Sequence, residues 1–117
     1  MRAVCVREPG DPDQMTIAEV PTPAPGPEEV RVQVHATALN RADTFQRRGH
    51  YPPPEGASSI LGLEMAGVVA ETGDAVLDWH EGDRVCSLLA GGGYAEQTVV
   101  HKDLLMAVPS GLSLREA

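Results

Sequence analysis

The fold is decided by residues 38–69, which read ALNRADTFQRRGHYPPPEGASSILGLEMAGVV. This stretch combines a helix start signal, three consecutive prolines and an apolar run interrupted by glycines. Asn40 and Asp43 have the spacing of a capping box, in which each side chain accepts the backbone N–H of the other residue. The pattern predicts a helix of about two turns over residues 41–48, ended by Gly49. A helix this short needs tertiary packing to be stable.

Tyr51 leads directly into the three prolines. Each proline ring fixes φ and disfavours helical geometry in the preceding residue, so Tyr51 is predicted to lie on a stiff, extended segment. Residues 60–72 then predict a β-strand, because they are apolar and rich in β-branched side chains, with Glu64 within the run. Gly62 and Gly67 interrupt this strand and indicate a bulge or a close approach of backbone or ligand.

The clearest strand precedes this stretch. Residues 29–37 alternate strictly between valine or alanine and polar side chains, which predicts one buried and one solvated face, with His35 on the solvated face. Similar short apolar runs bounded by turn residues predict further strands at 2–7, 15–20, 84–89, 94–101 and 104–108. Together they predict a mainly β domain of about seven to nine short strands with one short helix, partly closed like a barrel.

Charge and composition exclude several classes of partner. With 117 residues the chain has room for one domain, and its formal net charge is −8 with a pI near 4.8. Neither nucleic acid nor an anionic membrane would be attracted to such a chain. No apolar run is long enough to cross a bilayer, and the first residues lack the apolar core of a signal peptide, which predicts a cytoplasmic protein.

The residues that commonly bind metals are dispersed. Cys5 and Cys86 are the only cysteines, and each lies in an apolar run. A disulfide between them is one interpretation; small buried hydrophobic residues are the favoured one for a cytosolic chain. The four histidines have no ligand spacing, so no metal site is predicted. Residues 91–93 are all glycine but lack the spacing of a phosphate loop and precede a strand, which favours a turn.

A second capping box lies at the end of the chain. Ser113 and Glu116 predict the start of a helix, yet the sequence ends at Ala117. The favoured interpretation is that the sequence is the front part of a longer protein. A frayed terminal turn with a chance serine and glutamate is the alternative.

The ordered motifs LNRADTFQRRGHYPPP, ILGLEMAGVVAETG, EGDRV, GGGYAEQTVV and LLMAVPSGLS resemble a known family. They are similar to the N-terminal GroES-like catalytic domain of medium-chain dehydrogenases/reductases, most of all to NADPH:quinone oxidoreductases of the zeta-crystallin type. The resemblance implies a GroES-like, partly open β-barrel over residues 1–112. It also implies that residues 113–117 begin a connecting helix to a Rossmann domain that is absent from this chain.

The resemblance implies a reaction without zinc. Zinc alcohol dehydrogenases place a cysteine where this chain has Asn40 and a histidine where it has Leu63, and neither replacement is a good zinc ligand. The reaction implied is transfer of hydride or electrons from NADPH to a quinone. NADPH would be bound mainly by the missing domain, so the isolated chain is expected to be inactive.

Particular roles follow from the same resemblance. Asn40 and Asp43 would lie near the nicotinamide and its ribose as cofactor-binding residues. Tyr51 would face the acceptor as the catalytic residue, because a phenol can hydrogen-bond a quinone oxygen or supply a proton. Gln46 is a weaker candidate for the same substrate pocket, and Glu64 is assigned a buried structural role. The simpler alternatives are that Asn40 and Asp43 only cap the helix and that Tyr51 only packs on the prolines.

Two other functions stay open at this point. An enoyl reductase of the same superfamily would use the same cleft for a conjugated double bond. A truncated, non-catalytic module would instead use its exposed apolar face to bind a partner or to self-associate. The parent of a quinone oxidoreductase domain is expected to be a homo-oligomer.

Overall fold

Strand β3 lies between β6 and β4 in the larger of two sheets. The computed structural model describes residues 1–117, and the strand order in the five-stranded antiparallel sheet is β6-β3-β4-β5-β7. The elements in chain order are β1 (Arg2–Val6), η1 (Pro12–Gln14), β2 (Met15–Glu19), β3 (Glu29–Ala36), α1 (Arg41–Arg47), β4 (Glu64–Thr72), β5 (Arg84–Leu88), β6 (Gln97–His101), η2 (Lys102–Leu104) and β7 (Met106–Ala107). The predicted alternation in β3 is confirmed, since Val30 and Val32 are buried and His35 is exposed.

The core lies on the valine face of this sheet. Eight buried residues form it: Val30, Val32, Met65, Val69, Val76, Val85, Val100 and Leu105. Trp79 packs against this cluster, and its indole N–H donates to the carbonyl oxygen of Lys102 at 3.0 Å. A partly buried tryptophan is stable here because its one polar atom has an acceptor.

The smaller sheet closes one side of the barrel. Strands β1 and β2 pair antiparallel, and residues 94–96 pair with β1 instead of extending β6. The backbone N–H of Val4 donates to Tyr94 at 2.8 Å, and that of Glu96 donates to Arg2 at 3.1 Å. The strand predicted over 94–101 is therefore shorter than expected. The result is the expected mainly β, partly open barrel with one short helix.

Strand β4 also begins later than the sequence indicated. Residues 60–63 are not in a strand because Gly62 has φ +105°, which ordinary strand geometry does not allow. Gly67 stays within β4 but packs directly against the backbone of Gln33, where a side chain would collide with the carbonyl oxygen. Both predicted explanations are observed: the two glycines make close backbone approaches, and the β3–β4 register shifts by one residue opposite Gly67, between Val34 and Ala36.

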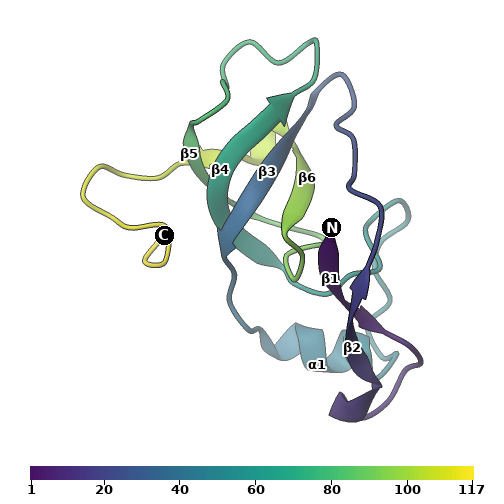
Figure 1. The fold of residues 1–117 in the computed structure, drawn as a ribbon. Coiled ribbons are helices and arrows are strands. Elements are labelled where there is room, and N and C mark those ends of the chain that lie inside the picture. Colours follow the sequence, from purple (N-terminus) through teal and green to yellow (C-terminus); the bar gives the residue numbers. More distant parts are fainter.

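Helix α1 forms where it was predicted and lies beyond the end of β3, beside the β1–β2 pair (Figure 1). Its carboxyl end is anchored by the N–H of Gly10, which donates to the carbonyl oxygen of Arg47 at 3.0 Å. Arg47 is buried, with 7% of its surface exposed, and forms no ion pair within the chain.

No helix in the structure combines the length and the apolar character needed to cross a membrane.

The two cysteines are less buried than predicted, and the last residues form the predicted capping contacts without a full helix. Cys5 and Cys86 are free thiols, and both are half-buried, not fully enclosed. The Ser113–Glu116 capping contacts form, with the serine hydroxyl donating to the glutamate at 2.8 Å. Residues 113–117 make turns over the edge of the main sheet without forming a complete helix.

Candidate functional site

A buried carboxylate, Asp43, joins three segments of the chain. Its side chain is on α1 and the residue is only 5% exposed. One carboxylate oxygen, Oδ2, accepts the backbone N–H of Asn40 and the hydroxyl of Tyr94, both at 2.7 Å. The other oxygen, Oδ1, accepts the backbone N–H of Gly62 at 3.3 Å. The predicted capping box is therefore present and is one part of a larger network.

Asn40 lies between two carboxylates. Its backbone N–H is held by Asp43, and its side-chain amide Nδ2 donates to Oε2 of Glu64 at 3.0 Å. Glu64 begins β4, is half-buried, and accepts the Thr37 hydroxyl through its carbonyl oxygen at 2.7 Å. We call the connected residues Glu64, Asn40, Asp43 and Tyr94 the Asp43 network. Hydrogen bonds fix Asn40 at both its main chain and its side chain.

Glycines bring the long-range members of this network together. A Cβ on Gly62 would lie 2.6 Å from Gly93 Cα and 2.6 Å from the Tyr94 nitrogen, so only glycine allows the two segments to touch. The N–H of Tyr94 donates to the carbonyl oxygen of Leu61 at 2.9 Å. Gly91 is similarly crowded, because a Cβ there would lie 2.5 Å from the Ser58 carbonyl oxygen. The glycine run thus serves backbone packing, in agreement with the absence of a phosphate-loop spacing.

Tyr94 has an unusual environment for a phenol. Burial raises its pKa above the ordinary value, and the hydrogen bond to the Asp43 carboxylate and the negative charges of Asp43 and Glu64 raise this pKa further. All of these causes oppose formation of a phenolate. Tyr94 is therefore a hydrogen-bond donor to Asp43 throughout the physiological pH range.

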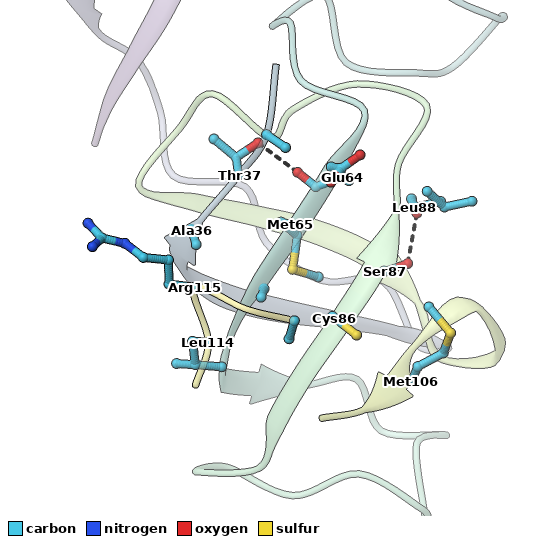
Figure 2. A pocket seen from close by; sticks show the side chains of 13 residues that line it. Ala36, Thr37, Glu64, Met65, Cys86, Ser87, Leu88, Met106, Leu114 and Arg115 are labelled. Atoms are coloured by element: carbon cyan, nitrogen blue, oxygen red, sulfur yellow. Dashed lines mark hydrogen bonds between the residues drawn. The ribbon is translucent and has the colours of Figure 1, made fainter. Parts of the chain in front are cut away.

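A small cavity lies beside Glu64 on the face of the main sheet (Figure 2). Its volume is about 150 Å³, and it is lined mostly by apolar side chains. Thr37 and Glu64 lie at one end, and Leu114 and Arg115 of the C-terminal segment lie at the other. Met65 and Cys86 lie between these ends, and Met106 lies on the far side of Cys86 from Leu114. The Ser87 hydroxyl is not available there, since it already donates to backbone carbonyl oxygens.

A second hollow also borders the carboxyl end of β3. It measures about 430 Å³ and is lined by residues that include Tyr94, His35 and Ile17. Ala36 and Thr37 line both hollows. The Asp43 network therefore extends from the small cavity, through Glu64, to this second hollow, through Tyr94.

The other residues implicated by the sequence lie apart from this network. Tyr51 is 49% exposed and takes part in no side-chain hydrogen bond. Gln46 is half-buried, and its Oε1 atom has no hydrogen-bond partner. Neither residue lines the small cavity or the second hollow. The structure thus links Asn40, Asp43 and Glu64 by hydrogen bonds, and neither Tyr51 nor Gln46 shares a side-chain hydrogen bond with them.

Tyr94 is the member of the network that sequence reasoning missed. It was interpreted only as the first residue of a strand following three glycines. A buried carboxylate needs several donors, and a tyrosine after a glycine run is a reasonable donor, but 51 residues separate it from Asp43. Nothing in the local sequence pattern of either residue indicates this pairing.

The residues at the zinc positions of related dehydrogenases do not fit that metal. Asn40 uses its amide N–H as a donor to Glu64, and Leu63 offers no ligand atom. No group of three or more histidine, cysteine, aspartate and glutamate side chains lies together in the structure. No step involving zinc is derived for this chain.

The sequence and the fold of this chain correspond to one family. Residues 26–110 match the alcohol dehydrogenase GroES-like domain, and the chain belongs to this family. Quinone oxidoreductase from mouse (Mus musculus) is 33% identical over 118 residues, which cover 99% of this chain and 36% of that protein. A 2-haloacrylate reductase from a Burkholderia species is 36% identical over 115 residues, covering 96% of this chain and 34% of that protein.

Solved structures show the same relationship. The quinone oxidoreductase of Escherichia coli, determined in complex with NADPH, superposes with a TM-score of 0.88 at 29% identity, covering 97% of this chain and 35% of that chain. The chain therefore spans about a third of the length of the relatives it matches.

Proposed function

We propose that this chain is the substrate-side domain of a zinc-independent, NADPH-dependent quinone oxidoreductase of the cytoplasm. Its similarity to quinone oxidoreductases over nearly the whole chain supports the proposal. The observation that carries it is the fixed position of Asn40, which is hydrogen-bonded to Asp43 and to Glu64, a residue that lines the small apolar cavity. A rigid amide there can orient a cofactor ring where zinc-dependent relatives use a metal ligand.

The residues of this chain fit one end of NADPH. Asn40 offers an amide beside Glu64, and Asp43 holds Asn40 in place. The glycine run cannot receive the phosphates, because Gly91 is packed against the Ser58 carbonyl oxygen. Most of the cofactor contacts are accordingly assigned to protein outside this chain. When bound, NADPH supplies the hydride.

Tyr51 is proposed to act on the quinone. Its hydroxyl has no partner within the chain, and about half of its side chain is exposed, so the phenol is available to an acceptor molecule. A hydrogen bond to a quinone oxygen stabilises negative charge that develops there, and a proton can follow. Gln46 on α1 is a second candidate for contact with the acceptor through its Nε2 amide, which can donate to a quinone oxygen, whereas its Oε1 is buried and can only accept.

Reduction of a conjugated double bond is the second candidate function. The 2-haloacrylate reductase is about as similar to this chain as the quinone oxidoreductases are, and its name describes such a substrate. The same amide and phenol could orient an enone, whose oxygen also gains negative charge. The two reactions differ in the acceptor alone.

A non-catalytic role would depend on the apolar surface of the main sheet. Leu88 is 72% exposed and Met106 is 54% exposed, and both line the small cavity. Such a surface is expected to self-associate or to bind another protein segment. It would be covered in a homo-oligomeric parent enzyme.

The experiment is to express the complete gene product, measure its intact mass, and follow NADPH consumption with 1,4-benzoquinone and, separately, with 2-chloroacrylate. Turnover with the quinone that persists after dialysis against a zinc chelator supports the proposal. Turnover with 2-chloroacrylate alone supports the second candidate. Absence of turnover with either acceptor refutes both and favours the non-catalytic role.

A further inference from the structure

The Asp43 carboxylate needs a second anchor beyond its own helix. Both groups on its Oδ2 atom lie at 2.7 Å, but one of them, the N–H of Asn40, is only three residues away. The contact between Oδ1 and the Gly62 N–H is longer, at 3.3 Å. Hydrogen bonds to a carboxylate weaken with length, so the Tyr94 hydroxyl is the shortest contact that ties Asp43 to the β-barrel.

Tyr94 is itself held by the barrel. Its backbone N–H donates to Leu61 at 2.9 Å, and its carbonyl oxygen accepts the N–H of Val4 at 2.8 Å. The phenol is thus aimed at Asp43 from backbone that is hydrogen-bonded on two sides. A functional group is positioned accurately when its supporting partners lie on such rigid elements.

From this geometry we propose that Tyr94 is a positioning residue for the cofactor: its hydroxyl fixes the Asp43 carboxylate in the orientation that holds Asn40 against Glu64. This inference rests on the proposed function, in which Asn40 orients the nicotinamide end of NADPH. Tyr94 lines the second hollow and not the Glu64 cavity, and its proposed effect on the cofactor passes through Asp43 and Asn40. Loss of the hydroxyl leaves Asp43 anchored to α1 and, weakly, to Gly62.

The test uses Tyr94→Phe, which removes one oxygen atom and keeps the ring. In the 117-residue chain, amide hydrogen exchange of Asn40 is expected to become about tenfold faster or more, while that of Val32 in the sheet stays unchanged. In the complete gene product, the Kd for NADPH is expected to rise about tenfold, equivalent to about 1.4 kcal/mol. Asn40→Ala should weaken binding similarly, and the double variant should bind no more weakly than either single variant.

The control separates positioning from loss of stability. Val30→Ala removes fully buried core methyl groups and lowers the free energy of unfolding, but it should leave the Kd for NADPH unchanged. Unchanged exchange at Asn40, an unchanged Kd in Tyr94→Phe, or additive losses in the double variant would each overturn the role of Tyr94. A wild-type protein that does not bind NADPH refutes the proposed function itself, and this failure is recognised before any residue is changed.

Discussion

The Tyr94 hydroxyl and the Oδ2 atom of Asp43 lie 2.7 Å apart although 51 residues separate them in sequence. The same oxygen accepts the N–H of Asn40, which caps α1. One atom therefore belongs both to a local helix cap and to a long-range contact between the helix and the barrel. A change at Asp43 must affect the stability of the domain and the geometry of the candidate site together.

Replacing Asp43 is expected to destabilise the domain strongly. Asp43→Ala leaves the N–H of Asn40, the N–H of Gly62 and the Tyr94 hydroxyl without their acceptor, and each buried unsatisfied donor costs about 1–3 kcal/mol. We expect the free energy of unfolding to fall by about 3–5 kcal/mol. Urea denaturation followed by fluorescence of Trp79, which packs on the core, measures this change.

Asp43→Asn is the matched control for this prediction. It keeps one acceptor oxygen in nearly the same position and removes the charge, so a loss of about 1–2 kcal/mol is expected. Equal losses in the two variants would contradict the view that the hydrogen bonds of Asp43 stabilise the fold.

The raised pKa of Tyr94 predicts loss of stability at alkaline pH. Burial and the Asp43 carboxylate keep the folded phenol protonated to a higher pH than the unfolded one, whose pKa is about 10. Above about pH 10 the unfolded chain therefore binds fewer protons than the folded chain, and the free energy of unfolding falls as pH rises. Below that pH the contribution of Tyr94 is fully present.

Two variants isolate this effect, because the chain has only two tyrosines. Unfolding curves between pH 8 and 11 should show a shallower decline for Tyr94→Phe than for wild type, whereas Tyr51→Phe should keep the full decline. Absorbance at 295 nm should show an ionisation step at a pH above that of the unfolded phenol in wild type and in Tyr51→Phe, and lose this step in Tyr94→Phe. A step of the same size and pH in Tyr94→Phe would contradict the assignment.

Gly62 is expected to be essential for folding, and Gly56 is its matched control. Both have a positive φ, +105° and +81°, so alanine at either position is strained by about 1–2 kcal/mol. A Cβ at Gly62 would additionally lie 2.6 Å from Gly93 Cα, whereas nothing lies within 4 Å of one at Gly56. Thermal unfolding should therefore show a modest loss in Gly56→Ala and a loss above about 4 kcal/mol, or no folded protein, in Gly62→Ala. Similar melting temperatures in the two variants would show that the Gly62–Gly93 approach is dispensable.

Local patterns predicted the elements of this fold better than their ends. The alternation in 29–37 and the Asn40–Asp43 spacing gave β3 and α1 correctly, because period and capping are properties of neighbouring residues. The strand predicted over 60–72 was too long, since the sequence does not show that Gly62 turns with a positive φ to meet Gly93. That contact depends on a segment about thirty residues away, which no propensity scale includes.

The candidate site was also predictable only in part: three of its four residues were identified from the sequence. Asn40, Asp43 and Glu64 were identified from the central stretch and its family resemblance, and the structure places them in one network. Tyr94 was missed because its partner is determined by the pairing of residues 94–96 with β1, which local sequence does not reveal. Tyr51 and Gln46 were predicted to line the substrate pocket, and their roles stay predictions, since neither residue lines the small cavity or the second hollow.

Tyr51→Phe tests the proposed catalytic residue in the complete gene product. Tyr51 is half-exposed and makes no side-chain hydrogen bond in the chain, so removing its hydroxyl should leave the melting temperature and the Kd for NADPH unchanged. If the phenol stabilises the developing charge on the acceptor oxygen, kcat with 1,4-benzoquinone should fall by about tenfold to hundredfold. Stopped-flow measurement of NADPH oxidation separates this step from product release. An unchanged kcat would instead assign Tyr51 to packing against the prolines that follow it, because such packing depends on the ring and not on the hydroxyl.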